Sequence, residues 1–182
     1  MNLDLSPALS RPELLAKPVA AALAEWAEGT GFAADTVAVA PIDPELADTA
    51  AFCAHYGVGL AESANCVVVA GKRGGVTSYA ACLVTAETRA DVNGVVRRRM
   101  DARKATFAPL DDVVAATGME YGGITPVGLP DGWPILIDSR VVEQAHVVIG
   151  SGIRGSKLWL PGAALATLPG AEVIEGLAAP VS

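Results

Sequence analysis

Two glycine-rich stretches are the parts of the chain best suited to holding a ligand with backbone groups. The first, EYGGITPVGLP at 120–130, has Gly or Pro at five of its eleven positions, and the second, GSGIRG at 150–155, closes the strand-like run AHVVIG. Glycine lets main-chain N–H groups approach a ligand closely, and Pro126 would fix the exit angle of the first stretch. Because each stretch adjoins a predicted strand end, a rigid frame could present these groups to a substrate, although both could equally be simple turns.

The familiar catalytic and metal-binding motifs are missing from the sequence. No HExxH, Walker or GxSxG motif is present, and Cys53, Cys66 and Cys82 show no CxxC spacing, which argues against a zinc site or a disulfide framework. We interpret the cysteines as small core residues. GSGIRG fits GxGxxG, but the following SKLWLPG favours a short strand over the helix that would hold a pyrophosphate. The sequence therefore predicts neither a metal nor a cofactor.

The charge balance limits the kinds of partner. The chain has 13 Lys and Arg against 20 Asp and Glu, a net charge of -7, which disfavours a protein that coats DNA or RNA. A small local contact with nucleic acid remains open. The basic residues concentrate at Arg97, Arg98, Arg99, Arg103 and Lys104, where a solvated helix end and a phosphate-binding patch are both consistent with the pattern.

The hydrophobic pattern is that of a soluble protein of one domain. Hydrophobic residues make up 52% of the chain but fall in short runs, none near the roughly 20 residues needed to cross a bilayer. The start, MNLDLSPALSRPELL, lacks a basic segment followed by an apolar one, so no secretory signal is visible. We therefore expect a cytoplasmic protein with no membrane partner, long enough to bury a sizeable core.

The first part of the chain predicts two helices. RPELLAKPVAAALAEWAEGTG has apolar residues at Val19, Leu23 and Trp26, with a stop near Gly29 and Gly31. DPELADTAAFCAHYG begins at a turn and ends in a glycine. A helix over this segment would place Leu46, Ala50 and Cys53 on one inner face. Both helices are expected to be packing elements.

The rest of the chain predicts strands with two further helices among them. NCVVVAG and VTSYAACLVT flank GKRGG, a loop of hairpin length. TRADVNGVVRRRM opens with Thr88 and Asp91 in a capping-box-like arrangement, and APLDDVVAATG has Pro109 near its start and Gly118 just past its end. Short strands are predicted at WPILID, AHVVIG and SKLWL. With no linker or repeat, the result is a mixed sheet with helices packed on it.

Three motifs, taken together, resemble those of a known family. GGITP at 122–126, ILID at 135–138 and SGIRG at 151–155 occur in the order and spacing of the YbaK/ProX family of aminoacyl-tRNA editing domains. These domains are relatives of the insertion domain of bacterial prolyl-tRNA synthetase. The resemblance begins at about Asp43 and continues to near the C-terminus.

The resemblance implies a fold and a division of the chain. The fold would be of the α+β class, a single domain whose mixed, mostly antiparallel and partly barrel-like β-sheet is flanked by helices. The editing-like domain would span 1–182, with its core at 43–178 and an N-terminal helical extension at 1–31.

The resemblance also implies a chemistry, the metal-free hydrolysis of the ester between a wrongly attached amino acid and the terminal ribose of tRNA. The loop with Gly122 and Gly123 would lie at the ester, where preorganised backbone amides can orient substrate and water. Thr125 could add a hydroxyl or simply stabilise the turn. Asp138 falls at the family's acidic position, where it would hold a ribose hydroxyl or a substrate amine, or else cap the turn before Val141.

The same likeness indicates residues that would bind the substrate. Arg154 is the cation placed where it could bind a phosphate. Ser151 and its neighbours could instead have a purely structural role. The candidate substrate-binding residues are Asn65, Ile124, Pro126, Ser151, Gly152 and Arg154.

The chain departs from the family at Asn65. Many members carry a lysine there, at the start of the first core strand, whereas an amide carries no charge and exerts no comparable attraction on a carbonyl or phosphate oxygen. Lys72 and Arg73 are expected in the hairpin loop, away from this point. The departure puts the editing activity itself in question.

Two functions are therefore compatible with the sequence. The first is a freestanding trans-editing hydrolase that removes a small amino acid such as Ala, Ser or Cys from a mischarged tRNA. Its partners would be the acceptor end of that tRNA and an aminoacyl-tRNA synthetase. The second is a binding module of the same fold that recognises an aminoacyl-adenosine end, a nucleotide or a protein. The two glycine-rich motifs and Asp138 favour the hydrolase.

Overall fold

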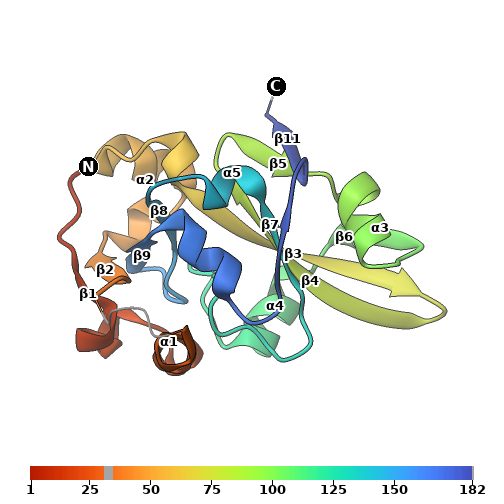
Figure 1. Ribbon diagram of the computed structural model, residues 1–182, viewed down its shortest axis with the longest axis horizontal. Coiled ribbons are helices and arrows are strands. Elements are labelled where there is room, and N and C mark those ends of the chain that lie inside the picture. The colour runs from red at the N-terminus through yellow and green to blue at the C-terminus, as the bar shows by residue number, and fades with distance from the viewer. Residues whose placement is uncertain (31–34, 182) are drawn as a thin grey trace.

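The computed structural model describes residues 1–30 and 35–181, and their strands form three sheets (Figure 1). Sheet A contains, in order, β1 (Ser6–Pro7), β2 (Ala38–Pro41), β9 (Ser156–Leu160) and β8 (Val147–Gly150). Sheet B contains β10 (Ala171–Ile174), β7 (Ile135–Asp138), β4 (Val76–Thr85), β3 (Ala64–Arg73) and β6 (Lys104–Phe107). The third sheet pairs β11 (Ala178–Pro180) with β5 (Thr88–Ala90).

Most of the strand pairs are antiparallel, and helices flank the sheets. Among the described ladders, only the pairs that β7 forms with β10 and with β4 are parallel. The helices are α1 (Lys17–Thr30), α2 (Thr49–Tyr56), α3 (Arg97–Arg99), α4 (Leu110–Thr117) and α5 (Ser139–Val142). The predicted α+β class is confirmed, and the described strands form no closed barrel. None of the helices that the structure describes is long and apolar enough to cross a membrane.

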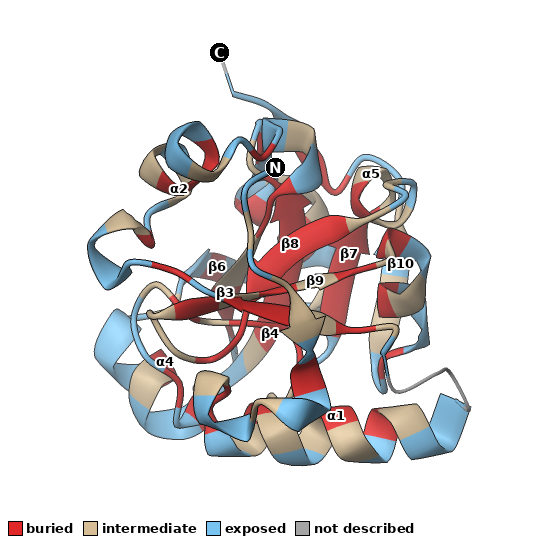
Figure 2. Ribbon diagram, turned by 90° about the vertical axis from the view of Figure 1, so that its left-hand side faces the viewer, coloured by how far each residue is buried: buried red, intermediate tan, exposed pale blue. Residues whose placement is uncertain are grey.

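Both faces of sheet B are buried at β7, which explains the unbroken apolar run ILI in this strand. Ile135 and Ile137 point into the cluster between sheets A and B, whereas Leu136 joins a second cluster on the opposite face. Buried strands of this kind read as continuous apolar runs, without the alternation of a half-exposed strand. Figure 2 shows the buried residues of β7 and β8 at the centre of the molecule.

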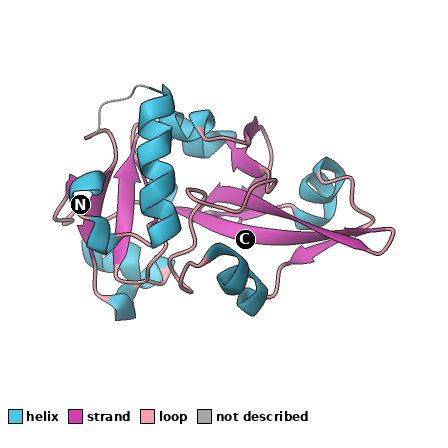
Figure 3. Ribbon diagram, turned by 90° about the horizontal axis from the view of Figure 1, so that it is seen from below, coloured by secondary structure: helices cyan, strands magenta, loops and turns pink. Residues whose placement is uncertain are grey.

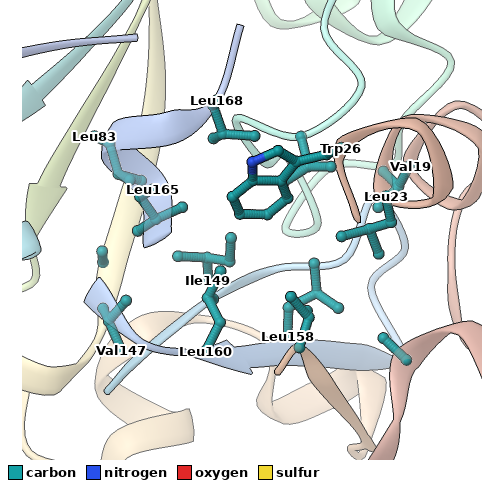
Figure 4. Close-up of a cluster of buried hydrophobic side chains, with 14 of the residues drawn as sticks. Val19, Leu23, Trp26, Leu83, Val147, Ile149, Leu158, Leu160, Leu165 and Leu168 are labelled. Carbon is teal, nitrogen blue, oxygen red and sulfur yellow. The ribbon is translucent and has the colours of Figure 1, made fainter. Parts of the chain in front are cut away.

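Helix α1 closes the cluster between the two sheets. Its buried residues Val19, Leu23 and Trp26 are spaced four and three apart, so they share one face, as predicted. Figure 4 shows these three side chains meeting residues of β8, β9 and the 3-10 turn Gly162–Thr167. The helix runs through Gly29 to Thr30, and the predicted stop at Gly31 lies outside the described residues.

The β3–β4 hairpin is longer than predicted. Its strands continue to Arg73 and restart at Val76, so the turn consists of Gly74 and Gly75 alone, both with positive φ (57° and 81°). Two-residue hairpin turns favour this conformation because its twist matches that of the strands. Lys72 and Arg73 therefore belong to a strand, near the tip of a hairpin that projects from the body of the molecule (Figure 3).

Two helix predictions need correction. In α2 the buried residues are Phe52 and Cys53, while Ala50 is exposed. Leu46 belongs to a separate 3-10 turn, Pro44–Leu46, so it does not share a helix face with Cys53. The helix does end at Gly57, which adopts a left-handed conformation with φ 66°.

The predicted cap at Thr88 is also wrong. Thr88 lies in β5, and Asp91 itself caps the following π-helical turn Val92–Val96 by accepting from the backbone N–H groups of Gly94 and Val95. The other predicted helix, α4, ends at Gly118 as expected.

Candidate active site

A cavity of about 330 Å³ lies where sheet A meets the start of β3. Four parts of the chain surround it: the N-terminus of α2, the first residues of β3, the end of β6 with the start of α4, and the first glycine-rich loop with the adjoining end of sheet A. Its lining consists of Ala47, Asp48, Thr49, Ala64, Asn65, Cys66, Val67, Val68, Phe107, Ala108, Leu110, Val113, Tyr121, Gly122, Ile124, Gly150 and Lys157. The volume suits a small ligand or one end of a large one.

The two glycine-rich loops pack against each other backbone to backbone beside this cavity. Gly152 N–H donates to the carbonyl of Gly123 at 2.7 Å, and Glu120 N–H donates to the carbonyl of Gly152 at 2.8 Å. A Cβ on Gly123 would come within 2.6 Å of the backbone of Ile153. This close approach is possible only for glycine, so the glycine content follows partly from packing.

The first loop keeps two backbone donors free. Gly122 has φ 82°, and its carbonyl accepts from Lys157 Nζ at 3.2 Å. The N–H groups of Gly122 and Ile124 donate to no acceptor among the described residues, although both residues line the cavity and are only partly buried. Free amide donors in a cavity wall can bind an oxygen atom that carries or develops negative charge.

Lys157 places an ammonium group in the cavity wall. It lies on β9, where Ser156, Leu158 and Leu160 are buried and Lys157 lies on the opposite face, toward Phe52 of α2. Its Nζ donates to the carbonyls of Ala47 and Gly122, both at 3.2 Å, and lies 5.5 Å from the centre of the Phe52 ring. Burial lowers the pKa of Lys157 below its usual range, and the neighbouring Arg154 contributes to this shift.

Asn65 lines the same cavity as Lys157. Its Oδ1 accepts a hydrogen bond of 2.7 Å from the hydroxyl of Thr49, the first residue of α2. This bond fixes the orientation of the amide. The position where many family members have a lysine thus carries a neutral group, while a lysine from another strand reaches the same space.

Arg154 stands at the rim of the cavity. Its Nη2 lies 3.8 Å from Asp48 Oδ1 and its Cζ 5.5 Å from the centre of the Tyr121 ring. Its Nη1 is buried with no hydrogen-bond partner among the described residues, and a Cβ added to Gly122 would lie 2.5 Å from it. Because Tyr121, Gly122 and Asp48 all line the cavity, Arg154 is placed to meet an anionic group entering it.

The thiol in the cavity is not activated as a nucleophile. Burial, with a smaller contribution from Cys82, raises the pKa of Cys66 well above its usual range, so the protonated form dominates at neutral pH. Burial likewise raises the pKa of Cys82 to about 12. All three cysteines are free, and the described residues contain no group of three His, Cys, Asp or Glu that could hold a metal.

Several predicted site residues lie away from the cavity. Thr125 is fully buried, and its hydroxyl has no hydrogen-bond partner among the described residues. Pro126 lines a different groove, beside α1. Gly123 and Gly152 hold the two loops together, and neither is part of the cavity lining.

Asp138 and Ser151 have structural contacts. Asp138 is buried and caps α5, with Oδ1 accepting from Arg140 N–H at 3.0 Å and Oδ2 from Ala178 N–H at 2.9 Å. These bonds match the capping alternative for this residue. The Ser151 hydroxyl is buried against Ser156, at 2.7 Å between the two oxygens. The cavity therefore brings together Asn65, Gly122 and Ile124, with Arg154 at its rim.

The residues that sequence reasoning missed include Lys157, Thr49 and Asp48. A signal for Lys157 existed in SKLWL, because strict alternation places this lysine opposite the buried Ser156 and Leu158. Thr49 and Asp48 carry no comparable signal. Only the packing of α2 against sheet A brings them near β3.

A larger groove, of about 1010 Å³, lies between α1, the loop 126–135 and the turn 167–170. Its titratable lining residues, among those that the structure describes, are the carboxylates of Glu25 and Asp131. It offers an anionic substrate no cation there, so we assign the chemistry to the smaller cavity.

Comparison with known proteins gives one family and several similar structures. The family model of the aminoacyl-tRNA editing domain matches residues 43–168, more than two thirds of the chain. No curated protein matches the chain.

Three solved structures show the same fold over 87% of this chain. The hypothetical protein APE2540 is 20% identical, with 99% of that chain covered and a TM-score of 0.73. A proposed trans-editing enzyme for prolyl tRNA synthetase is 21% identical, with 96% of it covered and a TM-score of 0.70. A scaffold protein used for epitope backbone grafting is 22% identical, with 97% of it covered and a TM-score of 0.68.

Proposed function

The chain belongs to the aminoacyl-tRNA editing domain family, and from this premise we propose that it is a trans-editing deacylase. The reaction is hydrolysis of the ester that joins a wrongly attached small amino acid to the terminal ribose of a tRNA. Water adds to the acyl carbon and the bond from that carbon to the ribose oxygen breaks. One water proton ends on the ribose hydroxyl, and the other is released as the amino acid carboxyl ionises.

The observation that carries this proposal is the pair of free backbone donors in the cavity wall. Ester hydrolysis passes through a tetrahedral species whose former carbonyl oxygen bears negative charge. The N–H groups of Gly122 and Ile124 have no acceptor among the described residues and belong to residues that line the cavity. Preorganised donors of this kind are worth about 100-fold or more in rate each. They need no titrating side chain.

The size and lining of the cavity support a small amino acid as the group removed. About 330 Å³ must accommodate the acyl group together with part of the terminal adenosine. The side chains of Val68, Leu110 and Val113 make one part of the wall apolar. Because a pocket separates substrates that differ by one methylene by only about 1 to 3 kcal/mol, we propose a preference among small residues such as Ala, Ser and Cys.

The rim and the overall charge support contact with the acceptor end alone. Arg154 has an unpaired Nη1 beside Gly122 and can receive a phosphate or ribose oxygen of the terminal nucleotides. The net charge of -7 disfavours a broad tRNA-binding surface. An aminoacyl-tRNA synthetase is the partner that would supply the mischarged tRNA, and one structural neighbour is described as acting for prolyl tRNA synthetase.

A deacylation assay with a panel of mischarged tRNAs tests the proposal. The panel begins with the proline tRNA carrying Ala, Ser or Cys, and it includes correctly charged tRNAs as negative controls. We expect release of one or more of the small amino acids at a rate well above that of uncatalysed hydrolysis. Binding of an aminoacyl-adenosine analogue without hydrolysis of any tRNA in the panel would instead indicate a binding module and contradict the proposal.

A further inference from the structure

Lys157 is a charged residue whose surroundings do not account for its charge. It is partly buried, yet the described residues offer no carboxylate within 4.0 Å of its Nζ. An ammonium has three N–H donors, and two of these go to the carbonyls of Ala47 and Gly122. One donor remains in a side chain that lines the cavity.

The groups that face Lys157 come from its own segment of the chain and from the N-terminal part of α2. Arg154 precedes it in the same segment and repels its charge, while Asp48 at the start of α2 attracts it. Asp48 is exposed and its carboxylate lies 3.8 Å from Arg154 Nη2, so it is shared between the two cations. From α2, the Cys53 thiol is kept protonated by burial, which raises its pKa, and the Phe52 ring lies under the ammonium. Keeping the ammonium of Lys157 partly buried costs solvation free energy. A residue held charged at such a cost is a candidate for binding a ligand.

The bond from Lys157 to Gly122 links the cation to the free backbone donors. Gly122 carries one of the two unpaired N–H groups, and its carbonyl accepts from Nζ. The ammonium is therefore held next to the loop at which an ester oxygen would bind. Three donors, two neutral and one charged, then belong to one wall of the cavity.

We propose that Lys157 is a catalytic residue that binds the ester carbonyl oxygen, and this inference rests on the proposed deacylase function. As water adds to the acyl carbon, the π electrons of the carbonyl move onto its oxygen, and the ammonium together with the two N–H groups stabilises that charge. When the acyl–oxygen bond to the ribose breaks, the electrons return to re-form the carbonyl. Lys157 keeps its proton throughout, so it acts as a charge and not as an acid.

Replacing Lys157 with methionine tests this role, because the change removes the charge and keeps the length of the aliphatic chain. We expect kcat on the mischarged tRNA to fall about 100-fold or more, as for other oxyanion donors, with KM changed much less. The matched control is Lys72→Met, which removes an exposed lysine from the β3–β4 hairpin and should leave kcat within about twofold of the natural protein. Thermal unfolding of both variants reports on the fold.

The pH dependence gives a second readout that a purely structural lysine would not move. Since burial lowers the pKa of Lys157, kcat of the natural protein should fall as pH rises through that lowered pKa, where the ammonium loses its proton. In Lys157→Arg the guanidinium stays charged over this range, so any residual activity should show no such fall. This arm of the experiment holds even where Lys157→Met does not fold.

The outcomes separate the deacylase function from the role of Lys157 in it. If the natural protein is active and folded Lys157→Met has the same kcat, the role of Lys157 is overturned and the deacylase function stands. The same conclusion follows if the alkaline fall is absent, or equal in Lys157→Arg. If the natural protein hydrolyses no tRNA in the panel, the deacylase function fails and this inference fails with it.

Discussion

The two glycine-rich loops have similar sequences but different surroundings. Gly122 in the first and Gly152 in the second both adopt positive φ, 82° and 87°. Gly122 lines the cavity, and a Cβ there would meet the mobile end of the Arg154 side chain. Gly152 is buried, and a Cβ there would collide with Ala16 and would lie 2.7 Å from Val19 Cγ2 of α1. The first loop faces a ligand space, whereas the second supports it from behind.

A glycine-rich signature alone therefore does not identify a binding loop. The φ angle is nearly the same at the two positions, so the difference lies in what surrounds them. The second loop holds the first in place through the bonds between Gly123 and Gly152 and between Glu120 and Gly152. It also ties the N-terminal segment to the site, because Ala16 N–H donates to the carbonyl of Ser151 at 3.2 Å.

Gly152→Ala should have the largest effect of the substitutions considered, and it should act on stability. A left-handed alanine costs about 1 to 2 kcal/mol, and overpacking against Ala16 and Val19 adds about 1 to 3 kcal/mol. We expect the free energy of unfolding to fall by about 3 kcal/mol or more, measured by urea denaturation with CD detection. A loss below about 1 kcal/mol would show that the second loop is not held rigidly against α1.

Gly122→Ala should instead act on catalysis. The same strain of about 1 to 2 kcal/mol applies, but the nearest atom is Arg154 Nη1, at the far end of a side chain that can move. We therefore expect a folded protein whose deacylation rate falls about 100-fold, because the methyl group occupies the space where the ester must approach and displaces the loop donors.

The measurement for Gly122→Ala pairs the deacylation assay with the same urea titration. A well-folded variant with full activity would contradict the placement of the ester at this loop. A variant destabilised as much as Gly152→Ala would remove the distinction between the two loops.

Much of the fold and part of the site could be predicted from the sequence. The inner face of α1 follows from the spacing of Val19, Leu23 and Trp26, and β7 from the apolar run before Asp138. These are local patterns that packing preserves. The π-helical turn after Asp91 was not predicted, because an aspartate can cap more than one kind of turn.

The cavity was predicted less well, because its walls come together only in three dimensions. Gly122 and Ile124 lie in a motif that the sequence shows, whereas Lys157 reaches them from a strand more than 30 residues later. Asp138 was expected at the site, but the backbone N–H groups of Arg140 and Ala178 occupy its two oxygens. Whether an acidic residue caps a helix or faces a ligand depends on its neighbours in space.

Asn65→Lys should have an intermediate effect whose direction depends on Lys157. In the natural protein the new ammonium would share a partly buried cavity with Lys157, and repulsion with desolvation should lower the deacylation rate about 10-fold. In the Lys157→Met background it would be the only ammonium among the described lining residues, and we expect it to raise the rate about 10-fold above Lys157→Met alone.

The four rates, for the natural protein, the two single variants and the double variant, form a double-mutant cycle. Asn65→Ala serves as the control, since it removes the bond to Thr49 without adding charge. If Asn65→Lys has an effect of the same sign and size in both backgrounds, lysines at positions 65 and 157 do not act on the same charge of the reacting ester.

The smallest effect is expected from a region distant from both loops. Arg97, Arg98 and Arg99 lie on α3, beside β6 in Figure 1, and none of them lines the cavity. Arg99 already pairs with Glu172, and Arg97 Nε donates to the carbonyl of Asn93, so two of the three have protein partners. Replacing all three with alanine should leave kcat/KM within about twofold, as for other surface substitutions.

Salt dependence completes this test of where the tRNA binds. If only the acceptor end is held, one or two phosphates are neutralised. The logarithm of the binding constant should then fall as the logarithm of the salt concentration rises. The slope should be near -1, because each single-strand phosphate contact contributes about 0.7. The slope should be unchanged when the three arginines of α3 are replaced, and it should become shallower in Arg154→Gln, which removes the cation at the rim of the cavity. A steep slope that the α3 variant abolishes would place the tRNA on α3, because counterion release reports each phosphate contact wherever it occurs. The cavity would then accept only the end of a tRNA that is held mainly elsewhere.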